Sequence, residues 1–162
     1  MLEPGTKAPD FILPDQAGAR IRLAAYHGKP VVLFFYPRDN SRGCTKEACA
    51  FRDDYSEFRS LGAAILGVSR DDSESHAEFR KSHDLPFPLL SDTAGEVARK
   101  FGVPKFLGMV PGRTTFVIGA GGIIRMAYSN MFNAASHSAR ALDCVRSLAD
   151  SRVERAAESI GA

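Results

Sequence analysis

A continuous apolar run, Val31 to Tyr36, gives way at once to Pro37 and a polar loop at residues 38–43. Because the run is rich in β-branched and aromatic residues, it predicts a central strand that is buried on both faces. Pro37 has no amide hydrogen with which to continue a ladder, so it ends the strand. A helix is then expected over residues 43–60, since apolar side chains recur there at spacings of three and four: Ala48, Phe51, Tyr55 and Phe58.

The rest of the chain alternates between strand-like and helix-like patterns. Turn residues 16–19 separate two short strand-like segments and predict an N-terminal β-hairpin. Alternating strands and helices that end in an antiparallel hairpin predict an α/β fold with a central mixed sheet flanked by helices. Periodicity does not fix the order of the strands. The later strands are expected at 63–68, 87–91, 113–118 and 122–128, and the helices at 71–82, 95–101 and from 134 onward.

Composition bounds the possible functions. The 162 residues predict one domain, 1–162, with a helical tail at 150–162 that frays or projects. The 21 Lys and Arg against 19 Asp and Glu leave a net charge of +2, which favours neither a nucleic-acid surface nor a polybasic membrane anchor. The apolar runs are far shorter than the ~20 residues that span a bilayer. Three cysteines are too few for a disulfide framework and no apolar leader is visible, so a cytoplasmic location is expected.

Cys44 follows a glycine at the expected start of the first long helix. A helix N-terminus presents unpaired amide hydrogens and about half a positive charge, and both favour a thiolate over a thiol. Arg42 and Lys46 flank the cysteine and act in the same direction. A redox cysteine at the strand-to-helix junction of a βαβ unit is the arrangement of thioredoxin-like folds. We therefore expect a thioredoxin-like fold with an N-terminal β-hairpin extension.

A thiolate alone does not make an enzyme. An ordinary thiol is about 3% ionised at pH 7, so full ionisation gains only about 30-fold, and lower basicity gives part of that back. Enzymes usually accelerate reactions by ~10⁶-fold or more. Further groups must therefore hold the substrate and stabilise a leaving oxygen. Ser41, the loop amides beside Cys44 and a cation from elsewhere in the chain are the candidates.

Cys49 lies five residues after Cys44. On a regular helix this spacing puts the two Cα atoms about 8.7 Å apart, beyond the ~4.4–6.8 Å that a disulfide usually spans. A bond between Cys44 and Cys49 therefore requires the first helical turns to unwind. The spacing favours a disulfide that forms transiently during turnover over a permanent one.

The segment resembles the active site of the peroxiredoxin family, whose pattern is Pro-x-x-x-Thr/Ser-x-x-Cys. Here it reads Pro37-Arg-Asp-Asn-Ser41-Arg-Gly-Cys44, with serine in place of the commoner threonine. The extension Cys44-Thr-Lys-Glu-Ala-Cys49 is similar to the bacterioferritin comigratory protein, or peroxiredoxin Q, subfamily, which resolves its own sulfenic acid within one chain. The resemblance covers the chain to about residue 148 and includes two further segments, Gly5–Phe11 and Pro111–Ile118.

The resemblance implies a role for each residue of the motif. Cys44 is the nucleophile that attacks a peroxide oxygen and becomes a sulfenic acid. Ser41 exchanges hydrogen bonds with the thiolate and the peroxide, and Pro37 packs over the site and limits water. Arg113 supplies the cation that stabilises the thiolate and the developing charge. Cys49 attacks the sulfenic acid and forms the disulfide.

The resemblance also implies partners for this antioxidant cycle. The substrate is hydrogen peroxide or an organic hydroperoxide, and thioredoxin or a similar dithiol reduces the disulfide. No cofactor is expected. Resolution within one chain needs no second subunit, so a monomer is expected.

Two other functions remain open from the residues alone. A thiol–disulfide oxidoreductase acting on proteins would use a Cys-x-x-Cys motif, whereas here four residues separate the cysteines. A redox sensor or holdase would use oxidation to melt the helix that begins at Cys44 and so expose Phe51, Tyr55 or Phe58.

The remaining cysteine and the histidines are expected to be structural. Cys144 lies beside an inward-facing stripe of the last helix and is interpreted as a packed core cysteine. His76 and His83 lie on a polar helix and are expected to be solvated. The histidines and cysteines lack the spacing of metal ligands, so no metal is expected.

Overall fold

The computed structural model describes residues 1–161 and centres on a five-stranded sheet with the order β5-β4-β3-β8-β9. The pairs β3–β4 and β4–β5 are parallel, whereas β3–β8 and β8–β9 are antiparallel. This arrangement confirms the predicted mixed sheet and supplies its order, with β3 at the centre. The strands are β3 (Val31–Phe35), β4 (Ala64–Ser69), β5 (Leu89–Ser91), β8 (Thr114–Ile118) and β9 (Ile124–Ser129).

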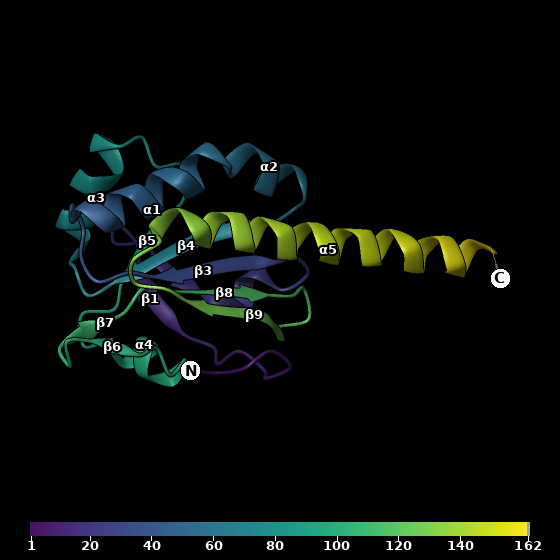
Figure 1. Cartoon of the computed structure of the whole chain (residues 1–162), viewed down its shortest axis with the longest axis horizontal. Helices are drawn as coiled ribbons and strands as arrows, with labels where there is room; N and C mark the ends of the chain where they lie inside the picture. The colour runs from purple at the N-terminus through teal and green to yellow at the C-terminus, as the bar shows by residue number, and fades with distance from the viewer. Residues whose placement is uncertain (162) are drawn as a thin grey trace.

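Helices cover the sheet unequally (Figure 1). One face carries α1 (Arg42–Asp53), α2 (Tyr55–Ser60), α3 (Ser73–Ser82) and α5 (Ala134–Gly161). The other face carries α4 (Glu96–Lys100) and the N-terminal segment. That segment forms the expected hairpin, and its elements are β1 (Ile12–Pro14), β2 (Arg20–Arg22) and the 3₁₀ turn η1 (Leu23–Tyr26).

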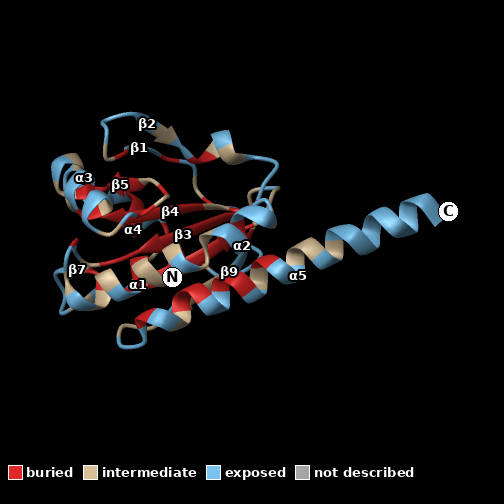
Figure 2. Ribbon diagram, turned by 90° about the horizontal axis from the view of Figure 1, so that it is seen from above, coloured by how far each residue is buried: buried red, intermediate tan, exposed pale blue. Residues whose placement is uncertain are grey.

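The alternation of side chains along β3 divides the core in two. Leu33 and Phe35 point into the cluster beneath α4 and the N-terminal segment. Phe34 and Tyr36 point into the cluster beneath α1, α3 and α5. All four side chains are almost completely buried, in agreement with the prediction of a strand covered on both faces (Figure 2). Phe34 stacks on Phe51 of α1 with 4.5 Å between the ring centroids, which fixes this helix against the sheet.

The single helix predicted over residues 43–60 is two helices. The apolar stripe is correct, since Phe51 and Phe58 are fully buried, but the helix breaks at Asp54, where φ is −92° and ψ is 0°. The cause lies elsewhere in the chain. The Asp54 carboxylate accepts a hydrogen bond of 2.7 Å from Ser138 on α5, and Ser138 also donates to the carbonyl of Ala50.

One small hairpin was not predicted. β6 (Lys105–Phe106) and β7 (Val110–Pro111) pair antiparallel. Their turn places Leu107 at φ +54° and Gly108 at φ +70°, and Leu107 is 80% exposed. Two-residue strands carry too little pattern to be recognised in a sequence.

The last helix is longer than the body of the molecule. α5 continues to Gly161, its final turns project beyond the sheet, and nearly every residue after 151 is exposed (Figures 1 and 2). Residue 162, the end of the predicted tail, lies outside the described residues. Within the described part of the chain, no helix combines the length and the apolar character needed to cross a membrane.

Candidate active site

Cys44 lies in the first turn of α1, as predicted, and is only 1% exposed. Ser41 caps the helix: its backbone is extended (φ −68°, ψ 151°), and its Oγ accepts a hydrogen bond of 3.3 Å from the amide of Cys44. This N-cap bond explains why the helix begins at Arg42 and why the thiol lies near the positive end of the helix dipole. Ser41 and Cys44 are therefore in direct contact through the backbone of the same turn.

Arg113 contacts the same turn, although it lies nearly seventy residues after Cys44 in the sequence. It directly precedes β8, and the antiparallel register pairs Thr114 with Phe35, so Arg113 lies beside the end of β3 and the start of α1. Its side chain is 4% exposed. A Cβ added to Gly43 would lie 2.6 Å from Nη2 of Arg113, so the guanidinium occupies the space that a larger residue at position 43 would fill.

Arg113 lies between an acidic side chain and the thiol of Cys44. Burial lowers the pKa of Arg113, but the Glu47 carboxylate, followed by Cys44, raises it by more, and the net shift is upward. Nη1 donates to Oε2 of Glu47, and Nε donates to the carbonyl of Met131 at 3.3 Å. The guanidinium thus remains charged and faces both an acidic side chain and the thiol.

Pro37 and Ser41 share a cavity with the unpredicted hairpin. The cavity holds about 300 Å³, and its lining is mainly apolar. Pro37 is half-buried at its edge. The β6–β7 hairpin therefore builds the opposite wall of the cavity. The lining residues are Pro37, Arg38, Ser41, Phe106, Leu107, Met109 and Val110.

Cys49 lies on the same continuous helix as Cys44, and both are free thiols. Cys44 is buried on the inner side of α1, whereas Cys49 is half-buried. Five residues of regular helix separate their Cα atoms by about 8.7 Å. The structure therefore brings Cys44, Ser41 and Arg113 together, with Pro37 at the edge of the cavity beside Ser41, and it leaves Cys49 out of bonding reach while α1 is intact.

Two acidic or basic groups behind the thiol were missed by sequence reasoning. Glu47 and His137 are both fully buried, and Nδ1 of His137 lies 3.8 Å from Oε1 of Glu47. Nε2 of His137 also donates to the carbonyl of Asn130 (2.8 Å), and its Nδ1 is hydrogen-bonded to Thr115 Oγ1 (2.9 Å). Glu47 had one available signal, since it lies three residues after Cys44 on the same helix and hence on nearly the same face. No such signal marked His137, because its hydrogen-bond partners lie in other segments of the chain.

A second buried network fixes the loop between Pro37 and Ser41. The carboxylate of Asp39 accepts a hydrogen bond from Tyr36 Oη at 2.6 Å and contacts Nδ1 of His76 at 2.7 Å. The amide of Asp39 donates to Asp71 at 2.9 Å. The ligand atoms of Asp39, Asp71 and His76 lie within 4.8 Å of one another, but hydrogen bonds already use them, so the cluster is best explained as an anchor for the loop.

The expectation that His76 is solvated is therefore wrong. His76 is fully buried, because its ring fills the space between Asp39 and the carbonyl of Leu90, to which Nε2 is 3.0 Å away. The stripe of α3 gave a signal, since His76 precedes the buried Phe79 by three residues. His83 is half-buried.

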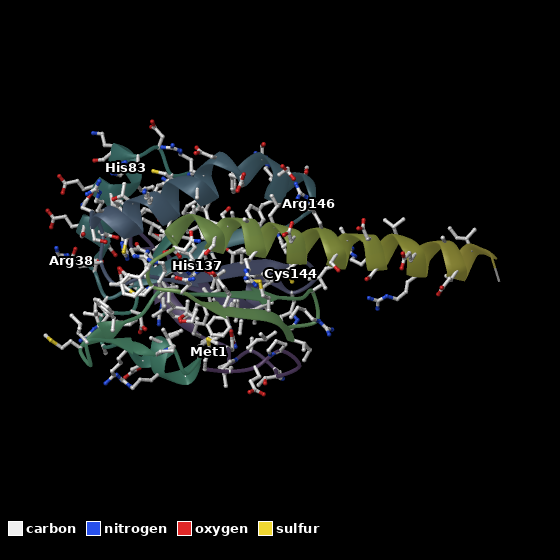
Figure 3. All side chains as sticks on the ribbon, viewed as in Figure 1. Met1, Arg38, His83, His137, Cys144 and Arg146 are labelled. Atoms are coloured by element: carbon white, nitrogen blue, oxygen red, sulfur yellow. The ribbon has the colours of Figure 1, made fainter. Side chains whose placement is uncertain are left out.

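Cys144 packs at the edge of the core, as expected. It is half-buried on α5, and burial raises the pKa of its thiol. Seven helical residues, about 10 Å of rise, separate it from His137 at the site (Figure 3). Cys144 is thus placed for packing and not for the chemistry at Cys44.

The acid sensitivity of the fold should depend on His137. Burial lowers the pKa of His137 from 6.5 to about 4, and the charge of Arg113 acts in the same direction. Because the folded value lies below the unfolded one, the stability that the neutral ring contributes is complete above pH 6.5 and is lost as the pH falls toward 4. The difference corresponds to about 3 kcal/mol of unfolding free energy. Urea unfolding at pH 7 and pH 4.5 should show this loss as a difference between the parent and a variant that lacks His137.

The matched variant is His137→Gln, which cannot take up a proton. Between pH 7 and pH 4.5 its unfolding free energy should fall less, or rise more, than that of the parent, whatever its absolute stability. Glu47 titrates in the opposite sense, since burial raises its pKa from 4.5 to about 8 against the opposing effect of Arg113. Its contribution therefore grows as the pH falls from 8 to 4.5 and is common to both proteins. Equal pH slopes for the two proteins would contradict the prediction.

Comparison with known proteins matches residues 4–127 to the AhpC/TSA family. A chloroplastic peroxiredoxin Q of Oryza sativa subsp. japonica is 46% identical over 145 residues, which are 89% of this chain and 67% of the relative. The structure of peroxidoxin BcpB from Mycobacterium tuberculosis has a TM-score of 0.85 at 40% identity and covers 91% of this chain and 99% of its own. The bacterioferritin comigratory protein of Xanthomonas campestris, studied for alkyl peroxide reduction, has a TM-score of 0.80 at 32% identity, with 86% and 92% covered.

The thioredoxin-like fold, with a cysteine at the start of the helix after its central strand, defines a thiol-dependent peroxidase. Within that class, the chain belongs to the peroxiredoxin Q, or bacterioferritin comigratory protein, subfamily of the AhpC/TSA family. The redox-active Cys44 is present, and membership implies a hydroperoxide substrate and an external reductant.

The expectation of a cytoplasmic location is wrong on the same comparison. The curated relatives from rice and from Sedum lineare are chloroplastic proteins. The expectation rested on the lack of a visible apolar leader and on cysteine usage, and cysteine usage reports the redox state of an environment and not the compartment.

Proposed function

We propose that Cys44 is the peroxidatic nucleophile and that Arg113, Ser41 and Pro37 form its site. The observation that carries this proposal is the contact between a buried cysteine in the first turn of α1 and the equally buried guanidinium of Arg113. The Cys44 thiolate attacks the terminal oxygen of ROOH, the O–O bond breaks, and Cys44 becomes a sulfenic acid. The leaving alkoxide takes a proton from water and departs as ROH.

Each of the other residues has a physical task in this step. Arg113 offsets the charge of the thiolate and then of the oxygen that leaves. The Oγ of Ser41 already accepts from the Cys44 amide, so its own hydrogen is free to donate to the thiolate or the peroxide. Pro37 has no amide hydrogen and adds an apolar surface that limits water at the reacting sulfur.

Cys49 is proposed to resolve the sulfenic acid within the chain. Its thiol attacks the sulfur of Cys44, a Cys44–Cys49 disulfide forms and water leaves. Because about 8.7 Å of helix separates the Cα atoms, the turn that contains both residues must unwind first. A dithiol such as thioredoxin then reduces the disulfide, and both thiols return to the state seen in the structure.

The substrate range follows from the pocket. A cavity of about 300 Å³ beside Ser41 has apolar walls from the β6–β7 hairpin. Hydrogen peroxide needs no such wall, whereas the alkyl group of an organic hydroperoxide would bury apolar surface there. Alkyl peroxide reduction is the activity named for the Xanthomonas campestris relative. Both substrate types are therefore proposed for this chain.

Two features of the molecule as a whole belong to this proposal. Both hydrophobic clusters pack on the same sheet, which supports one domain over residues 1–162 with a projecting tail. Resolution by a cysteine of the same helix needs no second subunit, which supports a monomer. Sedimentation equilibrium at micromolar concentration would test the latter.

The alternative functions gain little from the structure. The four residues between Cys44 and Cys49 lie in an intact helix, unlike a preformed Cys-x-x-Cys pair. A holdase would need to expose Phe51, yet Phe51 lies beyond Cys49 and is stacked on Phe34. Unwinding from Cys44 to Cys49 leaves that contact in place.

Intact mass and peptide mapping after one equivalent of hydrogen peroxide, without reductant, test the proposal. The expected product has lost two hydrogens, and the link maps to Cys44 and Cys49. An oxygen adduct that persists on Cys44, or a bridge to Cys144 or to a second chain, would contradict the assignment of Cys49. Failure of Cys44 to react within minutes would contradict the assignment of the nucleophile.

A further inference from the structure

Glu47 lies inside the segment that must unwind, between Cys44 and Cys49, and no step described so far uses it. Its side chain is fully buried and receives Nη1 of Arg113 on Oε2. Among the described residues, Oε1 has no hydrogen-bond partner, and Nδ1 of His137, which is 3.8 Å away, is bonded to Thr115. The carboxyl group of the turn that must unwind is thus hydrogen-bonded to the guanidinium of Arg113, which directly precedes β8. We call this hydrogen-bonded pair the tie.

Unwinding of the turn must break this tie. For a disulfide, the Cα atoms of Cys44 and Cys49 must approach by about 2–4 Å from their helical separation. The chain between them then leaves helical geometry, and Glu47 cannot stay in a pocket that is reached only from the helical position. Its departure leaves the buried guanidinium of Arg113 without its carboxylate partner, which is strongly unfavourable.

The charge of Cys44 controls the strength of this tie. Before the reaction, the thiolate and the carboxyl of Glu47 compete for one cation, and burial of Glu47 favours its neutral form. Oxidation turns the thiolate into a neutral sulfenic acid. Glu47 is then the one acidic partner that faces Arg113 among the described residues, so loss of the thiolate charge shifts Glu47 toward its ionised form and strengthens the pair. The tie is therefore strongest when the turn has to open.

We propose that Glu47 is a positioning residue whose pairing with Arg113 holds the Cys44 turn helical after oxidation. Breaking this pair limits the rate of disulfide formation. It therefore determines how long the sulfenic acid is exposed to a second peroxide. This inference rests on the proposed Cys44–Cys49 cycle. The competing step is Cys44–SOH + ROOH → Cys44–SO₂H + ROH, in which the sulfur is oxidised further and the peroxide is reduced to the alcohol.

Glu47→Gln tests the proposal, because glutamine keeps the shape and removes the charge. The variant and the parent are exposed to rising concentrations of hydrogen peroxide without reductant, and intact mass gives the share of disulfide and of sulfinic acid. Mass is the suitable readout because the chain has no tryptophan. The peroxide concentration that converts half of Cys44 to sulfinic acid should rise at least about tenfold, as expected when a hydrogen bond between charged groups becomes a neutral one.

Two companion variants separate a local role from a general one. Glu57→Gln makes the same substitution on α2, where Glu57 forms an exposed pair with Arg146 of α5. It should leave the half-point unchanged. Glu47→Asp keeps the charge on a shorter side chain and should shift the half-point less than glutamine does. Thermal unfolding of each protein shows whether it is folded.

The outcomes are distinguishable. If the parent forms the Cys44–Cys49 disulfide but Glu47→Gln forms sulfinic acid at the same or lower peroxide concentration, this inference is wrong and the proposed function stands. If the parent forms no such disulfide, the proposed resolving step fails and the inference fails with it. Unfolding of both Glu47 variants would overturn a local role, because Glu47 would then support the whole domain.

Discussion

Replacement of Cys44 by serine is expected to reduce peroxide consumption by about 10⁴–10⁶-fold, to the background rate, because a hydroxyl is a poor nucleophile at neutral pH. Ser41, Pro37 and Arg113 would all remain, but they act on a thiolate that no longer exists. The helix should be unaffected, since serine fits the space of a buried thiol at this position. Peroxide decay in the presence of a dithiol reductant, followed for both proteins, measures the change.

A second variant, Cys49→Ser, tests the resolving step. It should consume one equivalent of peroxide at nearly the parent rate and then stop or slow strongly, because the sulfenic acid has no partner within the chain. Cys144→Ser should behave as the parent, since Cys144 lies seven residues, or about 10 Å of helical rise, beyond His137 on α5. Sustained turnover by Cys44→Ser protein would place the active thiol elsewhere. A full burst by Cys49→Ser protein with normal turnover would remove Cys49 from the cycle.

The parts of the site that lie close together in the sequence could be predicted from it. The apolar strand, Pro37, the serine cap and the cysteine in the first turn follow from local rules on strands, prolines and helix ends. Arg113 lies nearly seventy residues from Cys44, and a family resemblance was needed to connect them. The register that pairs Thr114 with Phe35 is what brings the guanidinium to the thiol.

The buried polar groups behind the site could not be predicted in the same way. Hydrophobic periodicity assigns polar residues to the surface, and this rule placed His76 in solvent. His76 is buried because Asp39 and the Leu90 carbonyl satisfy its two nitrogens, and these partners lie 37 and 14 residues away. Glu47 and His137 are likewise buried because polar groups from other segments contact them. A buried polar residue therefore leaves at most a weak local signal, and its distant partners decide its burial.

The break at Asp54 and the β6–β7 hairpin show a different limit. The residues on either side of Asp54 continue the apolar stripe, so nothing local ends the helix, and the contact with Ser138 on α5 decides its end. The hairpin has strands of two residues each, too short for any period to show. The hairpin wall of the cavity beside Ser41 could therefore not be predicted from the sequence.

Gly43→Ala is expected to lower the rate constant for the reaction with peroxide by about 100-fold, the usual effect of displacing a positioned charge by about 1 Å. The added Cβ would lie 2.6 Å from Nη2 of Arg113 and 3.4 Å from its Cζ, so the guanidinium must shift away from Cys44. Its bonds to Glu47 and to the Met131 carbonyl limit where it can go. Single-turnover oxidation of Cys44, quenched and measured by mass over a range of peroxide concentrations, gives the rate constant.

Stability separates this effect from a packing defect. Gly43 lies in a helix at an ordinary backbone conformation, where alanine is favoured over glycine by up to ~1 kcal/mol, so the variant should unfold at the same or a higher temperature than the parent. Gly121→Ala is the matched control, because its added Cβ meets nothing within 4 Å, and it should leave the rate unchanged. A normal rate in Gly43→Ala protein would mean that the thiolate does not depend on the observed position of Arg113. A slow rate together with a lower unfolding temperature would trace the loss to the fold, whereas a slow rate in a fully stable protein assigns it to the guanidinium.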